Sequence, residues 1–131
     1  KKFDCKNLLT KIKSGANFFQ TQYAYDLDTL KHYMNRLNEF GVTDNAYYLV
    51  GLGVIKSSKS ALWMNKNLFG INIPDKIIKR IENSKNEEQE GIKICIELIQ
   101  EYKNIKGVHG IHLMGYHQEE QIALVISECQ K

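Results

Sequence analysis

The stretch SGANFFQTQYAYDLDTLKHYMNRLNEFG, residues 14–41, predicts a buried strand followed at once by an amphipathic helix. The aromatic and apolar run that begins at Phe18 is typical of a strand, whereas the apolar residues after Asp26 recur at helical spacing. Asp26 is placed to cap this helix, and Gly41 is placed to end it. A strand that leads directly into a helix is the repeating unit of a parallel α/β sheet.

The rest of the chain continues this alternation. We expect further strands over residues 46–54 (AYYLVGLGV) and 107–114 (GVHGIHLM), because both are short apolar runs bounded by turn residues. A helix is expected before the first strand, and others in SALWMNKN, PDKIIKRIENS, EEQEGIKICIELIQEYKNI and QEEQIALVISEC. This order predicts βαβ units with right-handed crossovers and a parallel sheet.

Composition indicates an ordinary globular domain that spans residues 1–131. The 18 basic and 15 acidic side chains give a formal charge of +3. Because the lysines are scattered along the chain, nucleic acid is not an expected partner. No run of about 18 apolar residues is present, so no membrane span is expected. The three cysteines are far apart and lack CxxC spacing, which favours reduced thiols in a cytoplasmic protein.

Three strands are few for a parallel sheet, which is normally covered on both faces. A barrel of alternating strands and helices needs eight strands and roughly 250 residues. The sequence therefore indicates part of a larger α/β architecture. It is either a piece of a barrel or a small open sheet that pairs with another chain.

Polar residues at the carboxyl end of the first strand are the main candidates for a site, because ligands of such folds lie there. Strand alternation places Gln20 and Gln22 on one face and Thr21 on the other. An amide both donates and accepts hydrogen bonds, which suits a heteroaromatic ring. The alternative is that Gln22 only satisfies the helix that begins near Asp26, and spacing alone leaves both interpretations open.

A metal site is not expected. Alternation would put His109 and His112 on opposite faces of the third strand, and no cysteine or carboxylate nearby completes a zinc set.

Several ordered segments resemble the carboxyl-terminal half of the methylenetetrahydrofolate reductase family. They are LLTKIKSGANFFQTQYAYD, GLGVIKSSKSA, FGINIPDKIIKRIE, QEGIKICIELIQ and GVHGIHLMG. The resemblance implies the last three strands of a TIM-type (β/α)8 barrel, with the helix that precedes them. It further implies FAD as cofactor and reduction of 5,10-methylenetetrahydrofolate to 5-methyltetrahydrofolate, a step of one-carbon metabolism and methionine biosynthesis.

The same resemblance implies roles for three residues. Lys11 matches a lysine that contacts the flavin cofactor, and Ala16 matches a backbone position beside it. Gln22 matches the glutamine that hydrogen-bonds the pterin ring of the folate. The chain departs from the family at Lys56-Ser57-Ser58-Lys59, where some members carry an aromatic residue that stacks on the folate. That departure leaves room for a different pterin.

The family's proton donor and its carboxylate near the flavin lie on earlier strands, so no catalytic residue is expected in these 131 residues. The electron donor is expected to be NAD(P)H or a protein. The alternative is a non-catalytic interaction module that uses its open sheet edges to pair with itself or with a separate amino-terminal subunit.

Overall fold

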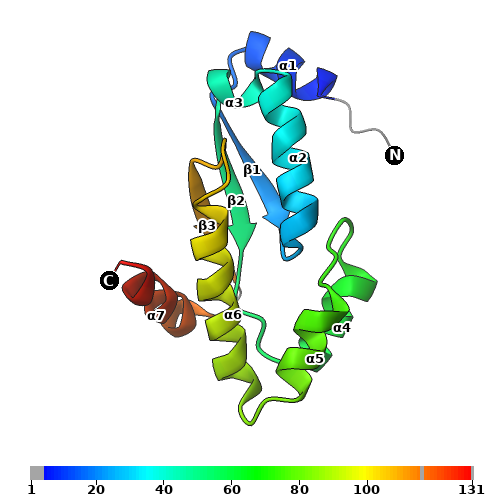
Figure 1. Cartoon of the computed structure of the whole chain (residues 1–131), viewed down its shortest axis with the longest axis vertical. Coiled ribbons are helices and arrows are strands. Elements are labelled where there is room, and N and C mark those ends of the chain that lie inside the picture. Colours follow the sequence, from blue (N-terminus) through cyan, green and yellow to red (C-terminus); the bar gives the residue numbers. More distant parts are fainter. Residues whose placement is uncertain (1–4, 116, 131) are drawn as a thin grey trace.

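The computed structural model describes residues 5–115 and 117–130. Three strands alternate with helices along the chain, as Figure 1 shows. The elements are α1 (Lys6–Lys13), β1 (Phe18–Tyr23), α2 (Leu27–Glu39), α3 (Val42–Asn45), β2 (Tyr47–Leu52), α4 (Ser58–Asn67), α5 (Asp75–Glu82), α6 (Glu87–Tyr102), β3 (Gly110–Leu113) and α7 (Glu119–Cys129).

The three strands form one parallel sheet in the order β1-β2-β3. The connection from β1 to β2 contains α2 and α3, and the connection from β2 to β3 contains α4, α5 and α6. The predicted α/β class with parallel strands is therefore confirmed.

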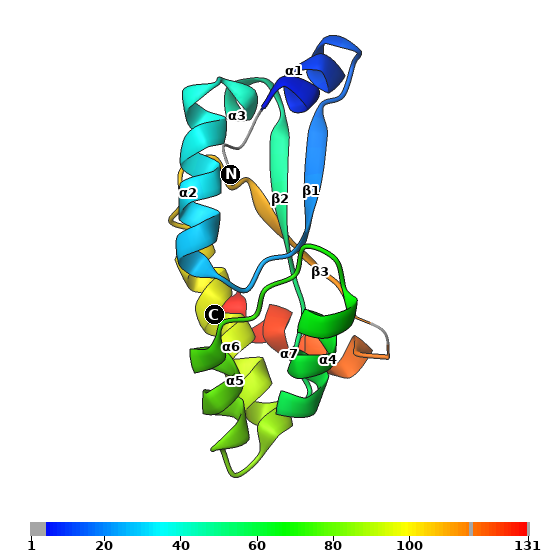
Figure 2. The same cartoon turned by 90° about the vertical axis from the view of Figure 1, so that its right-hand side faces the viewer.

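The two faces of the sheet differ in exposure. Tyr48 and Val50 of β2 are buried in the core, where α2 and α6 pack against the sheet. On the opposite face, Phe18 is 54% exposed and its register partner Tyr47 is 65% exposed. Figure 2 shows α2 and α6 on one side of the strands. We call the side that carries Phe18, Tyr47 and His112 the open face.

Local signals account for the main helices. The Asp26 carboxylate accepts a hydrogen bond from the Thr29 N–H at 3.3 Å, which confirms Asp26 as the N-cap of α2. Ser57 caps α4 and Asn86 caps α6 in the same way. The left-handed Gly41 follows α2, as predicted, although the short helix α3 after it was not expected.

The second and third strands are shorter than the predicted ranges 46–54 and 107–114, since β2 covers Tyr47–Leu52 and β3 covers Gly110–Leu113. The β3 pairing begins at Gly110 instead of residue 107, because residues 105–108 form a turn in which the Val108 N–H bonds the Ile105 carbonyl. The β1 pairing ends at Tyr23, after which the chain turns toward α2.

Gly91 fixes α6 against the chain that leaves β2. A Cβ atom at this position would lie 1.9 Å from the Ile55 carbonyl oxygen, so only glycine permits the contact. Residues 56–90 therefore begin and end at this contact between Ile55 and Gly91. None of the helices among the described residues is long and apolar enough to cross a bilayer.

Candidate functional site

A β-bulge lies at the carboxyl end of β1. Gln20 pairs with Leu49, but the next pair is Tyr23 with Gly51, so two residues of β1 lie opposite a single residue of β2. Bulges of this kind re-aim side chains and are common next to binding sites. The bulge thus interrupts simple alternation at the point where the sequence places its candidate residue.

The Thr21 side chain bridges the gap in the ladder. Its hydroxyl oxygen accepts a hydrogen bond from the Gly51 N–H at 2.8 Å and donates to the Gln22 carbonyl at 2.7 Å. Gly51 has no room for a side chain, because a Cβ would lie 2.7 Å from the Thr21 carbonyl oxygen. The polar exit of the strand is therefore partly structural.

The Gln22 side chain is exposed at this bulge. Its amide oxygen accepts a weak hydrogen bond from the Tyr23 N–H at 3.2 Å. Within the described part of the chain, no hydrogen bond engages its amide nitrogen. Asp26, and not Gln22, caps α2. The side chain therefore presents two N–H donors to the exterior.

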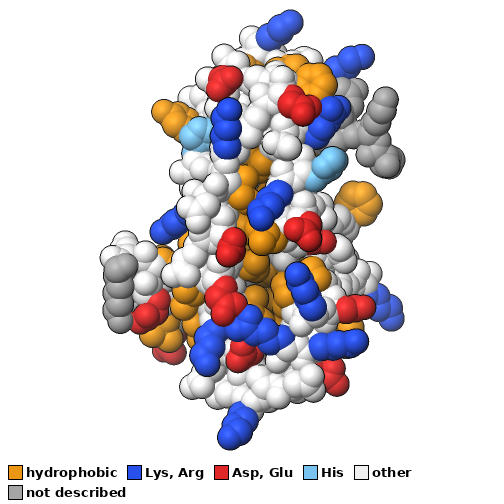
Figure 3. Space-filling view, in the orientation of Figure 1, with side chains coloured by type: hydrophobic (Ala, Val, Ile, Leu, Met, Phe, Trp, Pro, Cys, Tyr) orange, Lys and Arg blue, Asp and Glu red, His pale blue; other side chains and the backbone are white. Residues whose placement is uncertain are grey.

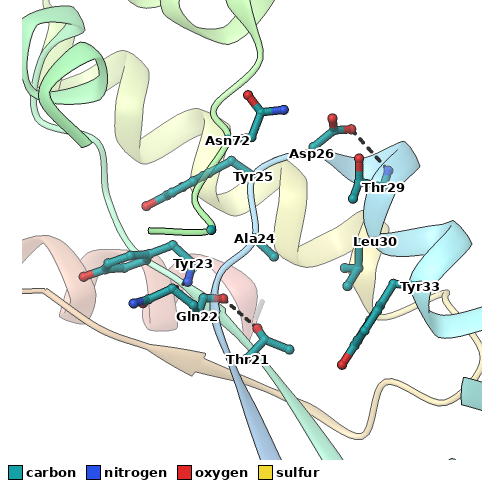
Figure 4. Close-up of a pocket in the computed structure, with 11 residues that line it drawn as sticks. Thr21, Gln22, Tyr23, Ala24, Tyr25, Asp26, Thr29, Leu30, Tyr33 and Asn72 are labelled. Carbon is teal, nitrogen blue, oxygen red and sulfur yellow. Dashed lines mark hydrogen bonds between the residues drawn. The ribbon is translucent and has the colours of Figure 1, made fainter. Parts of the chain in front are cut away.

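A cavity of about 330 Å³ opens beside these residues. Its walls come from the end of β1, the first turns of α2 and the loop between α4 and α5. They comprise Thr21, Gln22, Tyr23, Ala24, Tyr25, Asp26, Thr29, Leu30, Tyr33, Gly70 and Asn72. In Figure 4, Gln22, Tyr23 and Tyr25 extend to one side of β1, whereas Leu30 and Tyr33 lie on the other. The volume suits a small heteroaromatic group.

Two tyrosines that the sequence did not single out, Tyr23 and Tyr25, line this cavity. The rings of Tyr23 and Tyr25 stack with their centroids 5.8 Å apart. Tyr25 is buried, and its hydroxyl donates to the Gly53 carbonyl at 3.1 Å. Burial raises the pKa of Tyr25 well above its ordinary value and raises that of Tyr23 as well. Both rings are therefore neutral walls of the cavity.

The structure does not bring all three family-matched residues together. Lys11 lies near the end of α1, and Ala16 lies in the following turn, where its N–H bonds the Lys11 carbonyl at 2.9 Å. This turn is at the amino end of β1, whereas Gln22 is at the carboxyl end. The chain from Ala16 to Gln22 covers about 20 Å when extended. Only a long ligand could touch both ends.

The residues after β2 are engaged in structural contacts. Ser57 caps α4, and the Ser58 N–H and hydroxyl both donate to the Glu87 carboxylate, at 3.0 and 2.7 Å. These bonds lower the pKa of Glu87. The Lys56 ammonium donates to the His117 carbonyl at 3.2 Å, which ties the loop after β2 to the loop after β3. Lys56, Ser57 and Ser58 thus organise the loops.

His109, which precedes β3, and His112, which lies in it, have separate environments. His109 Nδ1 accepts from the Tyr48 N–H at 3.0 Å at the amino end of the sheet. His112 lies in β3 beside Gly51. Residues 5–115 and 117–130 contain no group of three or more His, Cys, Asp or Glu side chains that could hold a metal ion.

Sequence reasoning missed Gly70 and Asn72, which come from the loop between α4 and α5. Their only local signal is the turn-like FGIN segment that follows a helix. Nothing in that segment indicates that it folds back toward β1, some fifty residues earlier in the chain.

Charged groups do not form a block on the face seen in Figure 3, where basic and acidic side chains are interspersed. Arg80 bonds both Glu90 and Glu97 through its guanidinium group. The surface shown gives no support to a nucleic-acid interface.

Comparison with known proteins gives the family. No curated protein matches the chain. A solved structure titled "Uncharacterized protein from Clostridium thermocellum binds two copies of 5-methyl-5,6,7,8-tetrahydrofolic acid" is similar, with a TM-score of 0.64 and 17% identity. The match covers 95% of this chain and 46% of that one, so this chain spans about half the length of that protein. A family model described as methylenetetrahydrofolate reductase matches residues 1–130. The chain belongs to the methylenetetrahydrofolate reductase family.

Proposed function

We propose that the chain is the carboxyl-terminal part of a (β/α)8 barrel in a flavin-dependent reductase that converts 5,10-methylenetetrahydrofolate to 5-methyltetrahydrofolate. The observation that carries the proposal is the exposed Gln22 amide at the bulged carboxyl end of β1, next to the cavity. Membership of the family and the folate bound by the similar solved structure support a folate ligand.

The unpaired edges and the exposed face of the sheet support the barrel assignment. Its outer strands, β1 and β3, each have one unpaired edge among the described residues, and the open face exposes Phe18 and Tyr47. Closing a barrel removes sheet edges and fills the interior with side chains from all strands. Five further strands would cover this face, and the similar solved protein is about twice as long.

Gln22 would recognise the pterin ring. The edge of a pterin carries both hydrogen-bond donors and acceptors, and the two N–H groups of an amide can pair with its acceptors. Tyr23 and Tyr25 provide apolar walls beside the amide. These residues would orient the ring, and correct orientation is a large part of catalysis in a reaction whose chemistry belongs to a cofactor.

The residues matched to the flavin site, Lys11 and Ala16, suit the binding of part of FAD. Lys11 is exposed and engages no ion pair within the described part of the chain, so its ammonium is available to a pyrophosphate. Ala16 is a small residue that allows close approach of the backbone. The separation of these residues from Gln22 requires a ligand as extended as FAD. When bound, FAD supplies the hydride, and the residues of this chain hold and orient the reactants. We propose NAD(P)H or a protein as the electron donor.

The test uses the complete gene product that contains these residues. We expect it to show bound flavin in its absorption spectrum, to bind 5-methyltetrahydrofolate in a calorimetric titration, and to reduce 5,10-methylenetetrahydrofolate. Gln22→Leu should weaken folate binding by about tenfold, since it removes the amide hydrogen bonds. His32→Leu, at an exposed position of α2, is the control. A purified product without flavin or folate binding would refute the proposal.

The open face also supports the second candidate, a non-catalytic module that associates through its sheet. Phe18 and Tyr47 are large apolar side chains on the uncovered side. If this candidate is correct, the 131-residue chain should sediment as a dimer or bind a separate amino-terminal subunit, and Tyr47→Ser should weaken that association. A monomeric chain that acquires flavin only when the whole gene product is expressed would favour the reductase.

A further inference from the structure

His112 lies in one row with two residues of the neighbouring strands. In the sheet register it pairs with Gly51 of β2, and Gly51 pairs with Tyr23 of β1. Side chains paired in this way in a parallel sheet point to the same face. The row His112–Gly51–Tyr23 therefore crosses the sheet at its carboxyl end, where the cavity beside Gln22 begins.

The centre of this row carries no side chain of its own. A Cβ at position 51 would lie 2.5 Å from the methyl group of Met114, and 2.7 and 3.0 Å from the carbonyl oxygens of Thr21 and Gln22. Methionine has three rotatable side-chain bonds and repacks readily. A flat ring could therefore displace this methyl group and lie between His112 and Tyr23.

The two ring nitrogens of His112 have different surroundings. Nδ1 is buried and has no hydrogen-bond partner within the described residues. Nε2 is not among the buried unpaired atoms and has no bond to a described residue, and the side chain as a whole is half-buried. Nε2 is therefore the nitrogen that a ligand on the open face could reach.

The burial of Nδ1 selects one tautomer of the neutral ring. Orphaned buried N–H groups are rarer than under-satisfied acceptors, so the buried nitrogen is better left without a proton. The proton then resides on Nε2, because one ring nitrogen of neutral imidazole donates and the other accepts. His112 consequently presents an N–H donor toward the open face.

We propose that His112 is a positioning residue of the ligand site, whose Nε2–H donates to an acceptor on the edge of a flat heteroaromatic ring of pterin or flavin type. This inference rests on the proposed function and extends it. The ring would be held from β1 by the Gln22 amide and from β3 by His112, with Gly51 beneath it. The two donors come from opposite edges of the sheet, and together they fix the rotation of the ring in its plane.

Amide substitutions at His112 distinguish a role of Nε2 from a role of Nδ1. In His112→Gln the amide nitrogen is as many bonds from Cβ as Nε2, whereas in His112→Asn it matches Nδ1. His112→Phe keeps a ring without a donor. His32→Phe is the matched control, because His32 is exposed on α2.

The experiment titrates 5-methyltetrahydrofolate into the complete gene product and its variants, and measures their flavin content. We expect His112→Phe and His112→Asn to lose between about threefold and tenfold in affinity for one of the two ligands. His112→Gln should stay within about twofold of the wild type. A fall in folate affinity alone identifies the pterin, and a fall in flavin content alone identifies the flavin.

Two results would overturn the inference, and they differ from each other. If the wild type binds folate and flavin and all three His112 variants bind both equally well, His112 has no role while the proposed function stands. If the wild type binds neither ligand, the proposed function fails and the inference fails with it. Thermal unfolding of each variant shows whether a loss of binding reflects a loss of folding, and His112→Gln remains informative if His112→Phe does not fold.

Discussion

The Thr21 hydroxyl takes the place of a backbone carbonyl opposite Gly51. It accepts the Gly51 N–H at 2.8 Å at the position where the bulge breaks the regular pairing of β1 with β2. A side-chain oxygen thus completes the ladder, and the adjoining residue, Gln22, is exposed to the exterior. Thr21 thus stabilises the sheet, and the recognition role proposed above belongs to its neighbour Gln22.

Replacing the Thr21 hydroxyl should therefore destabilise the sheet. Thr21→Val keeps the shape but leaves the Gly51 N–H without its acceptor, and we expect a loss of about 1–2 kcal/mol in the free energy of unfolding. Urea titration followed by circular dichroism measures it. Thr21→Ser keeps the hydroxyl and should lose less than half as much. Equal stability of Thr21→Val and wild type would show that the bond is dispensable.

Gly91→Ala should be destabilising, although alanine is the better helix former. Helix propensity alone predicts a gain of about 1 kcal/mol. The added Cβ would meet the Ile55 carbonyl oxygen, and overpacking of this kind typically costs about 1–3 kcal/mol. Gln100→Ala, on the exposed side of the same helix, should be nearly neutral. A rise in the midpoint of thermal unfolding for Gly91→Ala would contradict the tight contact between α6 and the exit of β2.

Tyr102→Phe should loosen the attachment of α6 to the site. The Tyr102 hydroxyl donates to the Ala24 carbonyl at 2.6 Å, and Ala24 lines the cavity. Removing the hydroxyl leaves that carbonyl unpaired, so a loss of about 1 kcal/mol is expected on chemical denaturation. Tyr47→Phe is the matched control, since Tyr47 is 65% exposed. If both variants unfold at the same denaturant concentration, the bond contributes nothing.

Stability should fall at alkaline pH. Burial, with a smaller effect from Cys129, raises the pKa of the Cys95 thiol to about 12. In the unfolded chain this thiol loses its proton near pH 8.5, at about the ordinary cysteine value. Between these values the unfolded state binds fewer protons than the folded state, so the free energy of unfolding decreases as pH rises. Burial raises the pKa values of Tyr48 and Tyr102 in the same direction.

Urea midpoints measured from pH 7 to pH 10 test this dependence. We expect a level region up to about pH 8 and a decline above it. Cys95→Ala should make the decline shallower, because one of the groups responsible is removed. Stability that increases with pH over the same range would contradict the inferred burial of these groups.

Periodic patterns predicted the architecture well. The apolar stripe of α2 and its Asp26 cap, and the apolar runs of β2 and β3, are local signals that the tertiary structure retains. The short helix α3 has only four residues, too few to produce a period. The late start of β3 depends on the turn formed by residues 105–108, which an apolar run does not reveal.

The candidate site was less predictable, because its geometry depends on contacts between distant segments. Alternation along β1 placed Gln20 and Gln22 on one face, but the bulge arises from the pairing of Thr21 with Gly51, thirty residues away. Gly70 and Asn72 reach the cavity only because the loop between α4 and α5 folds back. The spacing of residues in a single sequence carries no information about contacts between such distant segments. The roles of Lys11, Ala16 and Gln22 remain predictions from the family resemblance.

The contact between Gly91 and Ile55 makes residues 56–90 a closed excursion from the sheet. The cost of closing a flexible loop grows slowly with its length, by about 0.6 kcal/mol for each doubling. A segment whose two ends are held together by such a contact can therefore gain or lose residues while the strands stay in register. Because this one carries Gly70 and Asn72 to the cavity, a change in its length would reshape the cavity without disturbing Thr21 or Gln22. The shape of the cavity and the stability of the sheet can thus change independently of each other.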